Sequence, residues 1–247
     1  MDIGLFIKIF FLIFVLSSCT SNFQTTSKKN MNCNNSNAIQ LMTDSIINNT
    51  TSIGEQLWMS ENLNVCTFRN GDSIHTAESI TDWMNYCDKM TPALYKLKLS
   101  INDYYKILNV NNSKTSNDTL EFVLYNNYVI TDDRNIAPYG WKIPRKKDWE
   151  LLIRNVKSDR YLLRNDTQVE SYGNPYKFNL SPMPLGFTKK GYDIFPSFSF
   201  LWSYPNELIC IHTLFDNDLE FAYDDPEDFR WHTATKYTGC CVRCVKE

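Results

Sequence analysis

The stretch APYGWKIPRKKDWELL (residues 137–152) joins a turn to the start of an amphipathic helix. Gly140 and Pro144 favour a turn, and proline is common at the first position of a helix. Four apolar residues then recur at the i, i+3, i+4 and i+7 spacing of one helix face: Trp149, Leu152, Ile153 and Val156. This pattern predicts a helix that begins near Arg145 and buries a tryptophan.

Two earlier segments have the same helical spacing. One contains Ile80, Trp83, Met84 and Cys87, and the other contains Ile101, Tyr104, Tyr105 and Leu108. Asn70-Gly71 predicts a turn. Aromatic-rich runs separated by turn residues predict strands at 195–202, 208–214 and 241–245.

The composition describes a folded, weakly acidic protein. Of its 247 residues, 25 are Lys or Arg and 28 are Asp or Glu, which gives a formal net charge of −3. Binding several nucleic-acid phosphates requires a basic surface, so we expect no nucleic-acid partner. Hydrophobic residues make up 43% of the chain, which is enough for a packed core. These residues become dense from position 51 and no second linker interrupts them, which predicts a single domain at 51–247.

The N-terminus has the features of an export signal. Residues 1–18 contain an apolar run that is shorter than the roughly 20 residues of a membrane span, and Lys8 interrupts it. The run ends in Leu-Ser-Ser before Cys19, which resembles the lipobox at which bacterial lipoproteins are cleaved and lipidated. The polar segment 19–50 predicts a flexible tether. We expect a lipid-anchored protein at the outer membrane or cell surface; an ordinary signal peptide and a short signal anchor are the alternatives.

Six segments have the order and approximate spacing of one bacterial domain family. They are IGEQLWMSENLNV (53–65), LYNNYVITDD (124–133), APYGWKIPRKKDWELL (137–152), FNLSPMPLGF (178–187), LWS (201–203) and CVRCVKE (241–247). Together they resemble the Fibrobacter succinogenes major paralogous domain, over essentially everything after the tether. The most specific pieces are W-M-x-E-N-L at 58–63, G-W-x-x-P followed by a tryptophan-bearing helix at 140–149, and V-R-C-V at 242–245.

The resemblance implies an α+β fold: a single C-type lectin-like domain with mostly antiparallel short strands, two to three short helices and paired N- and C-terminal strands. Domains of this family are generally found in secreted or surface lipoproteins of Bacteroidetes, and no enzymatic activity is attached to the family as such. The motif tryptophans Trp58, Trp141 and Trp149 are expected to be buried. Arg145-Lys146-Lys147 departs from the small polar helix cap of the family, and cations at this end weaken a helix unless an acidic neighbour compensates.

Seven cysteines remain if Cys19 is lipidated, so they cannot all pair within one chain. For six of them we expect a disulfide or a buried thiol: Cys66, Cys87, Cys210, Cys240, Cys241 and Cys244. Cys240 and Cys244 would lie about 13 Å apart along an extended strand, too far to bridge each other. A redox pair at Cys241 and Cys244, and a zinc site that uses His232, are weaker alternatives.

A sharper enzymatic alternative comes from the similarity to formylglycine-generating enzymes. These enzymes use two cysteines near the last strand, together with copper, to oxidise a substrate cysteine. Cys240 and Cys244 would have to take that role here, although their spacing does not reproduce the enzyme's motif. This oxidase hypothesis requires at least one of the two thiols to be reactive and reached by solvent.

An acidic run near position 220 is a weak calcium candidate. Its acidic residues match positions 1, 3, 5, 9 and 12 of a calcium loop: Asp216, Asp218, Glu220, Asp224 and Glu227. Phe221 occupies the position where the sharp turn of such a loop needs glycine. A solvated acidic turn is therefore the preferred interpretation, and we expect no cofactor other than this candidate calcium.

Five aromatic residues of the C-terminal third could stack on sugar rings: Trp202, Tyr204, Tyr223, Trp231 and Tyr237. Trp202, Tyr223 and Trp231 are the principal candidates. We therefore predict a non-catalytic binding or adhesion module for a glycan or a surface protein. The alternatives are the cysteine-dependent oxidase and a structural subunit of a surface assembly, which would expose a sizeable apolar patch.

Overall fold

The computed structural model describes residues 49–107, 117–156, 176–180, 184–188, 191–194, 198–212 and 229–247. By its internal contacts the chain divides into two units, 1–32 and 33–247, and all described residues belong to the second unit. Among the described residues, no helix has the length and apolar composition needed to cross a membrane.

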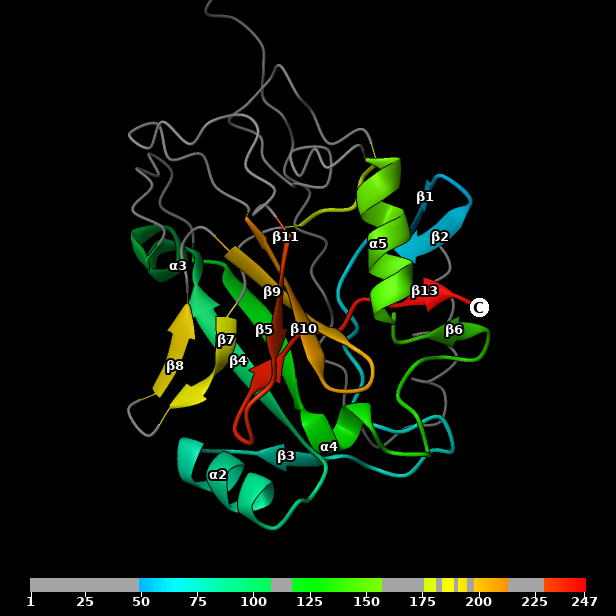
Figure 1. Ribbon diagram of the computed structural model, residues 1–247. Helices are drawn as coiled ribbons and strands as arrows, with labels where there is room; N and C mark the ends of the chain where they lie inside the picture. Colours follow the sequence, from blue (N-terminus) through cyan, green and yellow to red (C-terminus); the bar gives the residue numbers. More distant parts are fainter. Residues whose placement is uncertain are drawn as a thin grey trace, which may run out of the picture. The chain divides into compact units, whose positions relative to one another are not determined.

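The first sheet joins the two ends of the domain (Figure 1). Its four strands have the order β1-β2-β13-β6 and comprise Thr50–Ile53, Gln56–Met59, Val245–Lys246 and Trp141–Lys142. The strands are antiparallel, and Val245 of β13 lies opposite both Trp58 of β2 and Lys142 of β6. Two of the family motifs therefore meet at the pairing of an N-terminal strand with the C-terminal strand.

A second four-stranded sheet has the order β12-β5-β4-β3. Its strands are Gly239–Cys240, Thr119–Asn126, Ala93–Ser100 and His75–Ala77. β4 and β5 form a long antiparallel pair, whereas β3 pairs with β4 in parallel. The close approach of β12 requires glycine, because a Cβ atom on Gly239 would lie 2.6 Å from Cζ2 of Trp83.

Two smaller sheets complete the strand structure. β9 (Phe198–Ser203), β10 (Glu207–His212) and β11 (Phe229–Thr233) form an antiparallel sheet with β10 in the centre. β7 (Pro184–Thr188) and β8 (Gly191–Ile194) form an antiparallel pair. The two predicted strands at 195–202 and 208–214 thus correspond to β9 and β10.

The described residues contain four short helices, one more than the upper limit that we expected. They are α2 (Ile80–Asp88), α3 (Ile101–Ile107), α4 (Asn127–Ile130) and α5 (Lys146–Asn155). The three helices with apolar periodicity are confirmed. The fourth, α4, is a single turn that is too short to show periodicity, and only its cap at Asn126 marks it.

An acidic residue, Asp148, stabilises the start of α5 beside its three cations. The Asp148 carboxylate accepts a hydrogen bond of 2.8 Å from the backbone N–H of Arg145 and one of 2.8 Å from Nζ of Lys142. Asp148 therefore supplies the negative charge that a helix N-terminus favours, and α5 forms despite its unusual first turn.

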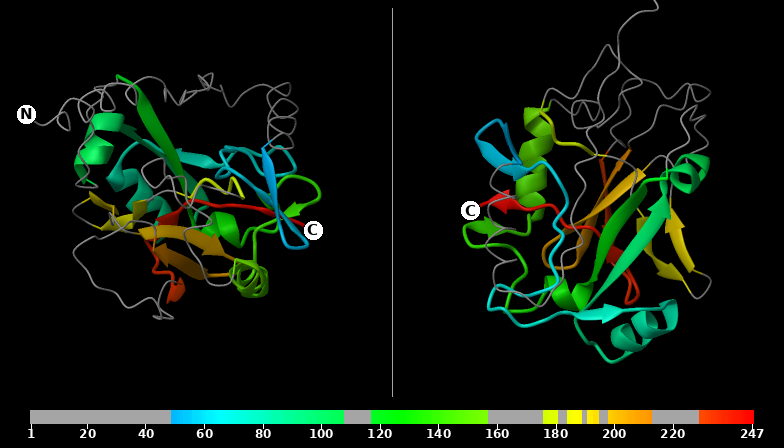
Figure 2. Two further views of the ribbon diagram at one scale, coloured as in Figure 1. Left: turned by 90° about the horizontal axis from the view of Figure 1, so that it is seen from above. Right: turned by 180° about the vertical axis from the view of Figure 1, so that it is seen from behind.

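The motif tryptophans are buried, as expected. Trp58 and Trp149 are fully buried, with ring centroids 4.7 Å apart, and Trp141 is 3% exposed. This contact packs α5 against the first sheet, where the two further views also place it (Figure 2). The α+β class and the mostly antiparallel pairing are thus established for the described residues.

The predicted strand at 241–245 is wrong. Gly239–Cys240 and Val245–Lys246 are separate strands in different sheets, and Cys241 forms only an isolated bridge with Leu201. The chain leaves the second sheet at β12 and enters the first at β13. Alternation of side chains along a single strand therefore does not describe Cys240–Cys244, because the intervening backbone changes its pairing partner.

Candidate functional site

A cavity of about 280 Å³ lies at the C-terminal end of α4. One wall is the loop that follows α4, from Thr131 to Asn135, and the other consists of β6 and its connection to α5, from Lys142 to Arg145. Tyr204, at the end of β9, completes the lining. This volume is near the lower end of the range of small-molecule sites, about 300–1,000 Å³.

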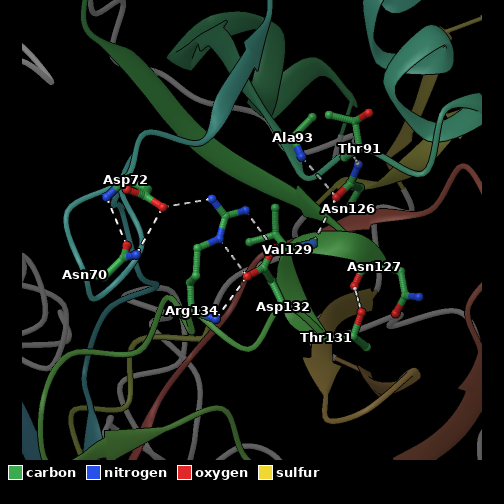
Figure 3. A network of polar contacts seen from close by, with 10 residues as sticks. All are labelled: Asn70, Asp72, Thr91, Ala93, Asn126, Asn127, Val129, Thr131, Asp132 and Arg134. Carbon is green, nitrogen blue, oxygen red and sulfur yellow. Dashed lines mark hydrogen bonds and ion pairs between the residues drawn. The ribbon is translucent and has the colours of Figure 1, made fainter.

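The β5–α4 junction holds the first wall in place. Asn126 is fully buried, and its Oδ1 accepts hydrogen bonds from the backbone N–H of Val129 and of Ala93. Its Nδ2 donates to the carbonyl of Thr91 over 2.9 Å (Figure 3). A single side chain therefore caps α4 and ties it to β4, which fixes where the wall begins.

An arginine network stabilises the same wall. Arg134 donates to both carboxylate oxygens of Asp132, at 2.9 and 2.8 Å, and over 3.1 Å to Asp72 on a distant loop (Figure 3). Its guanidinium carbon also lies 4.0 Å from the ring centroid of Phe68. The hydrogen bonds from Arg134 lower the pKa of Asp132, and hydrogen bonds from Asn70 and then Arg134 lower that of Asp72.

The second wall is built on the start of α5. Arg145 lies over the ring of Tyr204, with its guanidinium carbon 5.0 Å from the ring centroid. The backbone N–H of Tyr204 donates to the carbonyl of Pro144 over 2.8 Å, and Arg145 and Tyr204 form a parallel bridge. The β9–β10 hairpin is therefore joined to the start of α5, and the cation–π contact positions the Arg145 guanidinium at the cavity.

Some charged side chains at the cavity have an ion-pair partner within the protein, and others do not. Asp132 is paired with Arg134, and Lys142 is paired with Asp148 at 2.8 Å. Within the part of the chain that the structure describes, the side chains of Asp133 and Arg145 have no ion-pair partner, and both are exposed. The cavity thus offers one carboxylate acceptor and one set of guanidinium donors from different walls, close to an aromatic ring.

The prediction that Trp202 stacks on a ligand is wrong. Trp202 is completely buried and its Nε1 donates to the carbonyl of Tyr125 over 2.8 Å. Trp231 is half-buried, with Nζ of Lys146 5.0 Å from its ring centroid, and it does not line the cavity. Tyr223 lies outside the described residues. Tyr204, one of the wider set of five aromatics, is the one at the cavity.

The described cysteines are mostly buried thiols. Five of them are buried thiols: Cys87, Cys210, Cys240, Cys241 and Cys244. Burial raises the pKa of Cys87 to about 11 and the pKa values of Cys241 and Cys244 to about 12. Cys66 is disulfide-bonded and is therefore not one of these thiols. Cys19 lies outside the described residues.

No group of three or more His, Cys, Asp or Glu side chains suited to a metal ion occurs among the described residues. The zinc site suggested for His232 and the cysteines therefore gains no support among those residues. The calcium candidates Asp216, Asp218, Glu220 and Glu227 lie outside the described residues. That interpretation stays a prediction.

Three family motifs meet at one buried guanidinium. Arg243, 2% exposed, donates from Nε and Nη2 to Oδ1 of Asn62 at 3.0 and 2.6 Å. It also donates to the carbonyl of Phe178 and lies 4.6 Å from the centroid of that ring. Desolvation lowers the pKa of Arg243 to about 10. The motif residues Asn62, Phe178 and Arg243 thus hold the fold together and do not line the cavity.

Apart from Tyr204, sequence reasoning missed the residues that line the cavity. Asp132 and Asp133 belong to a recognised motif segment, and Arg145 stood out as an unusual helix start, yet neither feature predicted that these residues would line one cavity. The signal available in the sequence was the charge of Arg145 at a position where a helix disfavours it. A residue that weakens local structure is a candidate for a functional role.

Comparison with known proteins gives one match. A family model described as the Fibrobacter succinogenes major domain matches residues 51–246. No curated protein and no solved structure matches this chain. The matched residues include every described strand and helix except the first residue of β1.

Proposed function

Because this chain belongs to the Fibrobacter succinogenes major domain family, we propose that it is a lipid-anchored bacterial surface protein whose domain binds a glycan without catalysis. The observation that carries the proposal is the cavity between the α4 loop and the start of α5. Its lining combines an aromatic ring with an available carboxylate and an available guanidinium. Sugars bind through this combination, because their hydroxyls both donate and accept hydrogen bonds.

The fold assignment is part of the same proposal. We propose that the domain is C-type lectin-like, and the antiparallel pairing of β2 with β13 supports this, because it brings the N- and C-terminal strands together. The α+β architecture with short helices is consistent with it. Fold alone does not determine function, so the ligand is argued from the cavity.

The N-terminal sequence supports the membrane anchor. Cys19 follows a short apolar segment and small residues, and lipidation there would attach acyl chains to the 19–50 tether. Two or more acyl chains give a stable anchor. We therefore expect the protein in the outer membrane or at the cell surface, and a Cys19→Ala variant to lose its lipid in a mass measurement of the intact protein.

The oxidase alternative is less well supported. It needs a solvent-reached thiol at Cys240 or Cys244, but both side chains are fully buried and the pKa of Cys244 is raised to about 12. A structural subunit would need an apolar patch. Among the described residues, the large apolar side chains that are most exposed are Met90 and Tyr139, which come from different parts of the chain.

A glycan array with the full-length protein tests the proposal. The wild type is expected to bind a set of glycans, and Tyr204→Ala is expected to weaken binding at least about tenfold, because it removes the ring and releases Arg145. Tyr139→Ala is the matched control: this ring is 77% exposed and lies outside the cavity lining. The proposal would be contradicted if the wild type bound no glycan, or if Tyr204→Ala and Tyr139→Ala weakened glycan binding equally.

A further inference from the structure

The cavity lining contains two charged side chains of opposite sign that are not compensated by an ion pair among the described residues. Arg145 and Asp133 lie on different walls, and neither has an ion-pair partner among the described residues. The other charges around the cavity are compensated within the protein, Asp132 by Arg134 and Lys142 by Asp148. A ligand therefore meets one cationic and one anionic group.

Arg145 is arranged to receive a carboxylate. Its cation–π contact with Tyr204 limits the conformations of the side chain, and the planar guanidinium still has several N–H donors. Guanidinium groups bind carboxylates through two parallel hydrogen bonds, which are stronger than hydrogen bonds between neutral groups. A lysine in the same place would offer a point charge without this planar geometry.

Asp133 sets the second requirement. Its carboxylate accepts hydrogen bonds and repels another anion. A ligand that places a carboxylate at Arg145 must therefore place hydroxyl groups, not a second negative charge, at Asp133. A sugar ring with one carboxylate and several hydroxyls meets both requirements, and a cavity of about 280 Å³ limits the contact to roughly one such ring.

We propose that the cavity binds acidic glycans by a single uronic-acid-type sugar residue, whose carboxylate pairs with Arg145 and whose hydroxyls donate to Asp133. This proposal rests on the proposed glycan-binding function and specifies its ligand class. Binding is then sensitive to salt, because the attraction between Arg145 and the carboxylate is partly exposed to solvent.

The test compares two probes that differ at the carboxyl groups alone, which are charged in one and neutral methyl esters in the other. Hexagalacturonate and its fully methyl-esterified form are titrated calorimetrically into the full-length protein. We expect the acid to bind at least about tenfold more tightly than the ester, since esterification removes the charge-assisted hydrogen bonds. Arg145→Gln is expected to abolish this preference, and Arg145→Lys is expected to keep only part of it.

Lys147→Gln provides the matched control, because it also removes one positive charge at the start of α5 but lies outside the cavity lining. It is expected to keep the preference for the acid. If Arg145→Gln and Lys147→Gln lose the preference for the acid equally, the effect of charge is non-specific and the proposal is overturned. If a glycan array detects only neutral glycans, and Tyr204→Ala abolishes their binding, the acidic specificity is overturned while the glycan-binding function stands. If neither assay detects any glycan, both proposals fall.

Discussion

Arg243 donates two hydrogen bonds to a single atom of Asn62, its Oδ1, at 2.6 and 3.0 Å. The two residues are 181 positions apart and belong to the W-M-x-E-N-L and V-R-C-V motifs. Their contact explains why these motifs occur together: a buried charge needs polar partners, and Asn62 and the carbonyl of Phe178 supply them. The motifs that identify this family therefore maintain its fold.

Replacing Arg243 with Met should lower the free energy of unfolding by about 3 kcal/mol, because it leaves buried acceptors without their donor. Asn62→Ala should be similarly costly, since it removes a main partner of a buried charge. The double variant should cost less than the sum of the two single variants. Urea unfolding of the four proteins measures this coupling, and strict additivity would contradict the role that we assign to the contact.

Gly54→Ala should destabilise the β1–β2 turn in two ways. Gly54 has φ of +61°, and a Cβ atom there would lie 2.2 Å from Nδ2 of Asn155. We expect a loss of about 2–3 kcal/mol from backbone strain and the clash. Gly71→Ala is the control for strain alone, because φ is +93° and nothing lies within 4 Å of its Cβ position; it should cost about 1 kcal/mol. Thermal denaturation measures both variants. If Gly54→Ala and Gly71→Ala lower the stability equally, the clash with Asn155 is relieved without cost.

The buried thiols should resist alkylation in the native protein. Burial raises the pKa values of Cys87, Cys241 and Cys244 to about 11, 12 and 12, so the reactive thiolate is scarce at neutral pH. Iodoacetamide at pH 8 should label them only after unfolding, as read by peptide mass mapping. Rapid labelling of Cys244 in the folded protein would revive the oxidase hypothesis.

The same map should report the state of Cys66. We expect this residue to be disulfide-bonded and so to resist labelling even in denaturant until a reductant is added. A Cys66 peptide that labels without reduction would contradict this expectation.

Acid should weaken the α4 loop through the Arg134 network. The folded-state pKa values of Asp72 and Asp132 are lowered below their usual values, so these carboxylates stabilise the folded protein at neutral pH. That contribution is lost as the pH falls through the folded pKa values, below the ordinary 3.8. Arg134→Gln should therefore destabilise the protein clearly at pH 7 and much less at pH 2.5.

A surface pair provides the comparison for this pH series. Lys98 and Glu121 are 3.6 Å apart, with the lysine side chain 59% exposed, so Lys98→Gln should have little effect at either pH. Unfolding in urea at both pH values gives the change in the free energy of unfolding for each of the two variants at each pH. If Arg134→Gln has the same effect at pH 7 and pH 2.5, the ionised carboxylates do not carry the interaction.

The sequence predicted the elements whose periodicity is strong and local. Trp83, Tyr104 and Trp149 lie on buried helix faces because apolar residues recur at helical spacing around each of them. The end of the chain was less predictable. Whether Cys240 and Val245 share a strand depends on which distant strands accept their hydrogen bonds, and no local pattern encodes that choice.

The candidate site was harder to predict for the same reason. Trp202 and Tyr204 are two positions apart, with similar aromatic character, yet one is fully buried and the other lines the cavity. The difference comes from the contacts of Tyr204 with Pro144 and Arg145, which are some sixty residues away in the sequence. Composition and spacing therefore suggested aromatic ligand contacts but could not select the residue.

The measurement that tests the central claim most directly is hydrogen–deuterium exchange of the full-length protein with and without saturating hexagalacturonate. If the cavity binds the glycan, protection should appear in peptides covering 130–135 and 142–145 and around Tyr204, and Tyr204→Ala should abolish it. Protection confined to other peptides, such as those covering β11, with no change at these three segments, would contradict the account.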